Sequence, residues 1–141
     1  MTKGTYELVQ QGVSKRYVVY LKDEHGIVVL KSQYRELKPM CLNEIGWMRA
    51  AGLKDNLFEP LETEDGNLFF NLRATDAHVL ATSPLFRSEK DREACKEAVK
   101  RLAADAELVD RTPEIDLTTR VHEVLQDYAR EVMAKKIGAS D

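Results

Sequence analysis

The fold is decided by the stretch "NLFFNLRATDAHVLATSPLFRS", residues 67–88, because an earlier stretch has nearly the same pattern. That earlier stretch is "RYVVYLKDEHGIVVLKSQYRE", residues 16–36. When Leu21 is placed over Leu72, the two stretches align at an offset of 51 residues. A repeat of this kind predicts two copies of one supersecondary unit, since a unit that cannot bury its apolar side chains alone can do so against its copy.

Each copy contains strands followed by a helix. Tyr17, Val19 and Leu21 alternate with the residues between them, and Leu68, Phe70 and Leu72 do the same in the second copy, which is typical of β-strands. The period then changes from two residues to 3.6, which indicates a helix. The predicted strands are 5–10, 17–22, 27–32, 57–63, 68–73, 78–83 and 107–111.

The two predicted helices begin at Pro39, a favourable first helical residue, and after Ser88, a favourable N-cap. The alignment of the copies needs one extra residue beside Pro84, after which Arg35 meets Arg87 at an offset of 52. The side chains predicted to face the core are Leu42, Ile45, Trp47 and Met48 in the first helix and Ala94, Cys95, Ala98, Val99 and Leu102 in the second.

The stretch "FFNLRATDAHVLATSPLF", residues 69–86, resembles the recurring pattern of the YegP-like family, a bacterial and archaeal family whose biochemical role is not established. That pattern is an aromatic pair, Asn-Leu-Lys-Ala, an Asn-Gly turn, a Val-Ile-x-x-Ser strand, an aromatic residue and a helix. Residues 18–34 match it more loosely, and the resemblance covers about residues 4–111. The chain departs from the pattern at Asp76–Ala77, where the family prefers Asn-Gly, and at Glu44, where glycine is usual.

The resemblance implies an α+β fold in which two pseudo-symmetric β-β-β-α-β repeats form one mainly antiparallel sheet. Terminal strands would be exchanged between the repeats, and both helices would lie on one face. The resemblance also implies that family members with a single copy assemble as homodimers. In this chain the two tandem copies would take the places of the two subunits. We therefore expect a domain at 1–112, with repeats at about 4–56 and 57–112, and a C-terminal helical extension at 113–141.

The extension has the pattern of an amphipathic helix. Its apolar residues fall on one helical face: Leu117, Val121, Val124, Leu125, Tyr128, Val132 and Met133. This face could fold back onto the helix-free face of the sheet or pair with another chain. The side chains expected on that helix-free face are Val18, Tyr20, Ile27, Val29, Phe69 and Leu80, and such a face is too apolar to stay wet without a reason.

Nothing in the sequence names a reaction. The net charge of −3 gives no general attraction to phosphates, the N-terminus has no signal-peptide core, and Cys41 and Cys95 fit no metal-ligand spacing. No Gly-rich phosphate loop or GxSxG motif is present. We therefore expect a cytoplasmic protein with no catalytic, cofactor-binding or metal-binding residues.

The sequence predicts a non-enzymatic interaction module that binds a protein partner or its own copy through the sheet face or the C-terminal helix. Two alternatives stay open. One is binding of nucleic acid or a small anion through paired cations at matched positions of the copies, namely Lys22 with Arg73, Arg35 with Arg87, and Lys38 with Lys90. The other is an enzyme of unrecognised type. The candidate interaction surface is Tyr20, Lys22, Phe69, Arg73, Val124 and Tyr128.

Overall fold

The computed structural model describes residues 4–113, which form an α+β fold with one seven-stranded sheet and two α-helices. The strand order is β4-β5-β6-β3-β2-β1-β7. The strands are β1 (Thr5–Gln10), β2 (Tyr17–Lys22), β3 (Val28–Ser32), β4 (Phe58–Glu62), β5 (Leu68–Arg73), β6 (Val79–Thr82) and β7 (Glu107–Asp110). The predicted extension, with Val124 and Tyr128, lies outside the described residues.

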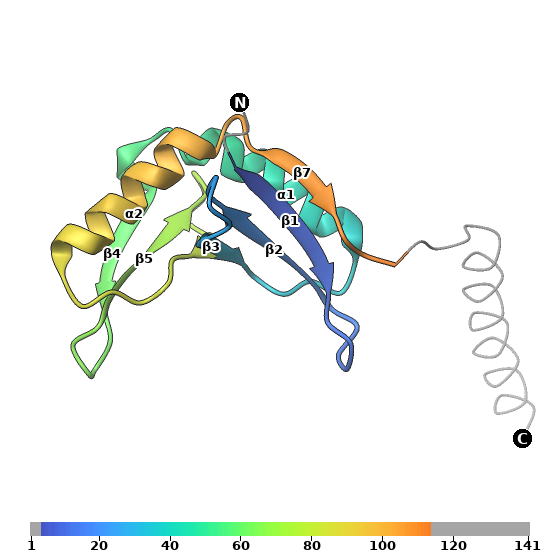
Figure 1. The fold of residues 1–141 in the computed structure, drawn as a ribbon, viewed down its shortest axis with the longest axis horizontal. Coiled ribbons are helices and arrows are strands. Elements are labelled where there is room, and N and C mark those ends of the chain that lie inside the picture. The colour runs from blue at the N-terminus through green and yellow to red at the C-terminus, as the bar shows by residue number, and fades with distance from the viewer. Residues whose placement is uncertain (1–3, 114–141) are drawn as a thin grey trace, which may run out of the picture.

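The sheet is mixed but mostly antiparallel, since only β7 runs parallel to its neighbour, β1. The central strands β3 and β6 pair antiparallel, with Lys31 opposite Thr82. These two residues are 51 positions apart, so they are equivalent in the two copies. Equivalent residues that face each other across antiparallel strands place an approximate twofold axis between them, and Figure 1 shows the two halves of the arch on either side of it.

The same buried hydrogen bonds recur at equivalent positions of the two copies. The Ser32 hydroxyl accepts from the Val19 amide at 2.8 Å, and the Ser83 hydroxyl accepts from the Phe70 amide at 2.9 Å. Each hydroxyl also donates to the carbonyl of the next residue. The repeated serine of the sequence pattern therefore satisfies a buried strand amide in both copies.

The offset of 51 residues holds from β2 to α1 against β5 to α2, so the extra residue predicted beside Pro84 is wrong. Only β1 and β4, before the first hairpin of each copy, are related by 52. The backbone of Tyr17 pairs with that of Arg35, and the backbone of Leu68 pairs with that of Phe86. The helices α1 (Lys38–Ala51) and α2 (Glu89–Leu102) also begin at equivalent positions. Alignment of similar side chains had matched Arg35 to Arg87, whereas the backbone position of Arg35 is taken by Phe86.

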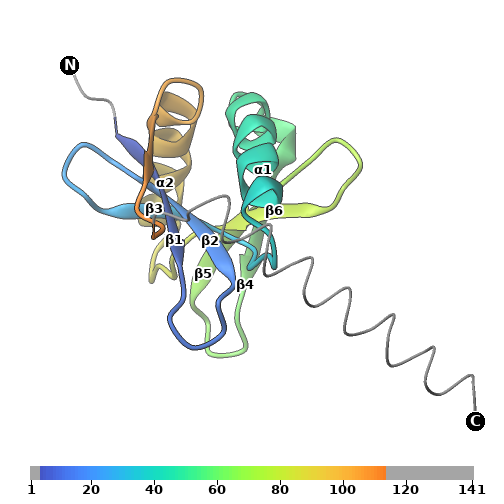
Figure 2. The same cartoon turned by 90° about the vertical axis from the view of Figure 1, so that its right-hand side faces the viewer.

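Both helices lie on the same face of the sheet, as Figures 1 and 2 show. Pro39 occupies the first turn of α1, and Ser88 caps α2 by accepting from the Asp91 amide at 3.1 Å. Between the helices and the sheet lies the core, whose largest fully buried side chains are Tyr6, Leu8, Leu21, Leu30, Met48, Phe70, Leu72, Leu80 and Leu102. No helix within residues 4–113 has the length and apolar character to cross a membrane.

The predicted core faces of the helices are only partly right. Ile45 and Met48 of α1 are buried, but Leu42 and Trp47 are 40% and 43% exposed. The buried stripe of α1 instead includes Glu44, which is drawn inward by an ion pair with Arg35. In α2 the buried residues are Cys95, Val99 and Leu102, while Ala94 is exposed and Ala98 half-buried.

The expected composition of the helix-free face also needs correction. Val29 and Leu80 are buried in the core on the helix side. Each lies beside a β-bulge, after Leu21 in the first copy and after Leu72 in the second. A bulge inserts one residue and re-aims the side chains next to it, which turns Val29 and Leu80 toward the helices.

One further residue of that expected set lies elsewhere, and Val18 is on the expected face but buried. Ile27 precedes β3 and lies beside α2 rather than on the helix-free face. Val18, which alternates with core residues of β2, is fully buried although neither helix covers it. Tyr20 and Phe69 are half-buried and remain on the helix-free face.

The outer edge at β4 is closed to further strands by Pro60. The backbone of Phe70, opposite Pro60, is directed toward Ser83 of β6, so the backbone of Pro60 points away from the sheet. Because proline lacks an amide hydrogen, this edge cannot form a continuous ladder. On the other side of the pseudo-twofold, Leu8 of β1 occupies the corresponding place and is covered by β7.

Candidate functional site

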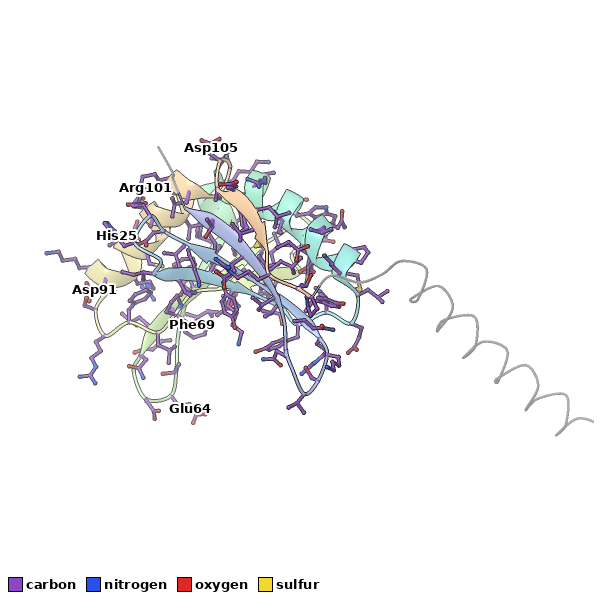
Figure 3. All side chains as sticks on the ribbon, turned by 45° about the vertical axis from the view of Figure 1, so that its right-hand side comes forward. His25, Glu64, Phe69, Asp91, Arg101 and Asp105 are labelled. Atoms are coloured by element: carbon purple, nitrogen blue, oxygen red, sulfur yellow. The ribbon has the colours of Figure 1, made fainter. Side chains whose placement is uncertain are left out.

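The candidate site is the face of the sheet opposite the helices, here named the concave face. Figure 1 shows the sheet as an arch with α1 and α2 on its outer side. The β1–β2 and β4–β5 hairpins extend from the two ends of the arch away from the helices, and Figure 3 labels Glu64 at the tip of the second hairpin. The concave face is therefore bordered by two hairpins.

A row of polar side chains crosses the middle of the concave face. Tyr20 of β2 pairs with Lys31 of β3, Lys31 with Thr82 of β6, and Thr82 with Asn71 of β5. The Thr82 hydroxyl donates to the Asn71 side chain at 2.7 Å. Because residues directly opposite each other in neighbouring strands share a face, these four side chains lie in one line.

Lys31 and Arg16 hold the ring of Tyr34 between them. The Lys31 ammonium lies 4.6 Å and the Arg16 guanidinium 4.9 Å from the ring centroid, which is the range of cation–π contact. The Gln11 amide donates to the Tyr34 hydroxyl at 3.1 Å. Hydrogen bonding with Lys31 lowers the pKa of Tyr34, and the same contact raises the pKa of Lys31, so the lysine stays charged.

The matched cations predicted from the sequence are already paired. Lys22 lies 3.1 Å from a carboxylate oxygen of Glu7, and Arg73 lies 2.7 Å from one of Glu59. Burial acts to raise the pKa of Glu7, but the hydrogen bonds from Lys22 and Arg111 together lower it, and the hydrogen bond from Arg73 lowers the pKa of Glu59. The two ion pairs are related by the pseudo-twofold and keep both carboxylates ionised.

Sequence reasoning placed Tyr20 and Phe69 on this face correctly but missed the cluster of Arg16, Lys31 and Tyr34. Neither Lys31 nor Arg16 forms an ion pair with a carboxylate of the described chain. The strand alternation assigns Lys31 to the face of Tyr20, which was a usable signal. The approach of Arg16 to Tyr34 depends on the backbone pairing of Tyr17 with Arg35, which no local pattern reveals.

The two thiols are not placed for nucleophilic chemistry. Burial raises the pKa of Cys41 to about 11 and that of Cys95 to about 12, and both cysteines are free. A thiol is a poor nucleophile until it ionises, so both groups act as small core side chains near neutral pH. Among residues 4–113, no three His, Cys, Asp or Glu side chains are grouped so that they could hold a metal ion.

Comparison with known families matches residues 64–110 to the model described as "Domain of unknown function (DUF1508)". A UPF0339 protein of Pseudomonas aeruginosa is 31% identical over 88 residues, which are 62% of this chain and 80% of the relative. A UPF0339 protein of Acinetobacter baylyi is 29% identical over 109 residues, which are 77% of this chain and 97% of the relative. The family match falls in the second copy, and the relatives extend the similarity over both.

Two structures solved by NMR share the fold. YegP of E. coli, a protein of unknown function, superposes with a TM-score of 0.76 at 21% identity, covering 82% of this chain and 98% of YegP. A UPF0339 protein of Shewanella oneidensis superposes with a TM-score of 0.74 at 22% identity, covering 79% of this chain and 93% of that protein. At such identities the likeness establishes the fold alone.

Proposed function

The chain belongs to the UPF0339 family, which has the YegP-like fold and no established function, and we propose that it is a non-enzymatic interaction module that binds a protein partner on its concave face. The observation that carries the proposal is the cluster of Lys31, Arg16 and Tyr34, where two cations have no carboxylate partner among the residues of the structure. Half-buried Tyr20 and Phe69 share the face with this cluster. Tyrosine, phenylalanine and arginine side chains are enriched at protein-binding surfaces.

The partner that fits this face is an extended protein segment with an acidic residue. A carboxylate would reach Lys31, the only cation of the row across the four central strands, at the pseudo-twofold. Glu7 and Glu59 lie on the outer strands at the two ends of the same row. These carboxylates would repel a phosphate backbone crossing the sheet, so nucleic acid is the second candidate rather than the first.

Site-specific cross-linking in cells of the source organism tests this proposal. A photoreactive benzoylphenylalanine replaces Phe69 on the concave face, and the matched control replaces exposed Lys90 on α2. We expect a protein adduct from position 69 that is absent from position 90 and absent when Lys31→Glu is added. An adduct of twice 16.1 kDa would identify a second copy as the partner.

Two results would overturn the proposal. Equal amounts of protein adduct from positions 69 and 90 would show that proteins do not bind the concave face in preference to the surface of α2. Loss of the position-69 adduct after nuclease treatment would assign the face to nucleic acid instead. Circular dichroism and thermal melting of Lys31→Glu serve as the check on folding, because Lys31 is half-exposed and its replacement should leave the core intact.

A further inference from the structure

A groove lies beside α2, on the opposite side of the sheet from the concave face. Its cavity volume is about 440 Å3, within the range of small-molecule sites. Its lining includes buried Val29 and Cys95, with half-buried Phe86 and exposed Ile27. Figure 2 shows the β2–β3 hairpin projecting beyond α2, and the groove lies between this hairpin and the helix.

In the first copy, Trp47 takes the position that Ala98 has beside α2, and a smaller pocket of about 250 Å3 lies next to it. Trp47 is the equivalent of Ala98 in the first copy, and its ring lies 5.1 Å from that of His78, the equivalent of Ile27. On the α2 side the small side chain of Ala98 leaves that volume open. The space beside the helix therefore differs between the two copies in size and lining, and it is larger beside α2.

The walls of the two grooves differ in polarity as well as in size. In the first copy, Arg35 and Glu44 form an ion pair at the base of the α1 groove. Their equivalents in the second copy are Phe86 and Cys95, which are both apolar and line the open groove. Where the first copy has an ion pair and a tryptophan, the second copy therefore has only apolar side chains.

Charge at the rim of the groove is negative. Asp23 and Asp91 are the charged residues that line it, and their equivalents in the other copy, Ala74 and Met40, are uncharged. One carboxylate oxygen of Asp23 accepts from two backbone amides of the hairpin, at 2.9 Å each. Asp91 forms no ion pair within the part of the chain that the structure describes.

An ion pair ties the hairpin to the helix beside the groove. Arg101 near the end of α2 forms an ion pair at 2.8 Å with Glu24 of the hairpin, which ties the hairpin to the helix. Figure 3 shows Asp91 near the start of the same helix, with Arg101 further along it and His25 on the neighbouring hairpin. Asp91 therefore lies away from this ion pair, at the start of the helix.

We propose that the α2 groove binds a small organic cation, an amine with an aromatic or branched apolar body. The apolar body would lie against Phe86, Ile27 and Ala98, and the ammonium would lie at the rim beside Asp91, with Asp23 adding to the negative charge of the lining. The residues that create this site are those at which the two copies differ. The proposal does not depend on the concave face, which is on the other side of the sheet.

Titration followed by amide NMR tests the proposal with three probes of matched shape. We expect phenethylamine to shift the amides of Val28, Val29 and Ala98 saturably, and phenylacetate to bind at least tenfold more weakly. Asp91→Asn should weaken phenethylamine binding several-fold and leave neutral 2-phenylethanol unchanged. Asp91 is exposed, so this variant should fold.

Filling the groove is the second arm of the experiment. Ala98→Trp places in the second copy the residue found at the equivalent position of the first, and it should abolish the shifts by occupying the groove. The matched control Ala50→Trp adds the same side chain at an exposed position of α1 and should leave them unchanged. The proposal is overturned if phenethylamine causes no saturable shift at millimolar concentration, if phenylacetate binds equally well, or if the shifts survive in a folded Ala98→Trp protein.

Discussion

Ala77 has a left-handed backbone conformation, and the equivalent residue of the first copy, which has the same conformation, is a glycine. Its φ is +75°, and Gly26, its equivalent, has φ +80°. Both residues close the same turn, with the amide of each donating to the carbonyl three residues before. An L side chain in the left-handed region costs about 1 kcal/mol, so Ala77 is strained. This explains physically why the Asn-Gly turn is the usual form at this place.

Relief of this strain is a direct prediction. Ala77→Gly should raise the free energy of unfolding by about 1 kcal/mol, measured by urea denaturation. The reciprocal variant Gly26→Ala should lower it by a similar amount, since nothing lies within 4 Å of the added methyl group and strain is the only effect. If Ala77→Gly is neutral or destabilising, the turn is not strained as the φ angle indicates.

The strands β1 and β2 and the end of β7 are joined at Glu7. One carboxylate oxygen of Glu7 lies 3.1 Å from Lys22 of β2 and 3.2 Å from Arg111, just after β7. The backbone of Arg111 also donates to Leu8 at 2.9 Å. Burial alone would raise the pKa of Glu7, but the hydrogen bonds from Lys22 and Arg111 prevail and lower it.

This pKa gives the stability of the sheet a defined dependence on pH. A carboxyl whose pKa is lower in the folded state stabilises the fold above its unfolded pKa, about 4.3, and loses that contribution as the pH falls through the folded value. Glu7→Gln should therefore lower the free energy of unfolding by about 1 kcal/mol at pH 7. The difference between the two proteins should shrink as the pH falls from about 5 to 3.

Urea denaturation at several pH values between 3 and 7 checks this prediction, with Glu64→Gln as the control. Glu64 lies exposed in the β4–β5 turn and has no ion pair among the residues the structure describes. Its replacement should leave the pH dependence as it is. A Glu7→Gln protein whose stability runs parallel to that of the wild type from pH 7 to pH 3 would contradict the assignment.

The bounds of the strands and helices were predictable to within one or two residues. The alternation of side chains along each strand and the helix cap at Ser88 are local signals in the sequence. Which side chains of each helix face the core was harder to predict. Trp47 looks like a core residue by its type, yet it is 43% exposed because it lies at the side of the helix, with its ring against that of His78. Glu44 looks like a surface residue, yet its ion pair with Arg35 brings it inside.

The architecture of the whole molecule follows from the repeated stretch, but its functional surfaces do not. The repeat predicts a pseudo-twofold axis between the copies, and the equivalent residues Lys31 and Thr82 meet at it. The concave-face cluster combines Arg16 with Lys31 and Tyr34 from the other side of a hairpin. The α2 groove lies where the side chains at equivalent positions of the two copies differ in size. The size of a side chain in the sequence does not show whether a neighbouring residue occupies the space beside it.

The C-terminal ends of the two helices meet at the pseudo-twofold. Gly52, just after α1, and Ala103, just after α2, are equivalent residues of the two copies. A methyl group built on Gly52 would lie 2.3 Å from that of Ala103 and 3.1 Å from the carbonyl oxygen of Met48. Neither neighbour is the flexible end of a long side chain. The two copies can therefore approach closely only if one of these positions is glycine.

This contact gives a prediction for the assembly of the two halves. Gly52→Ala should lower the free energy of unfolding by roughly 1–3 kcal/mol through overpacking. The double variant with Ala103→Gly, which exchanges the two residues across the axis, should recover most of that loss. Gly46→Ala is the control, because Gly46 lies in the same helix with nothing within 4 Å and should gain about 1 kcal/mol. Urea denaturation measures all four proteins, and a double variant no more stable than Gly52→Ala would show that the helix ends do not meet.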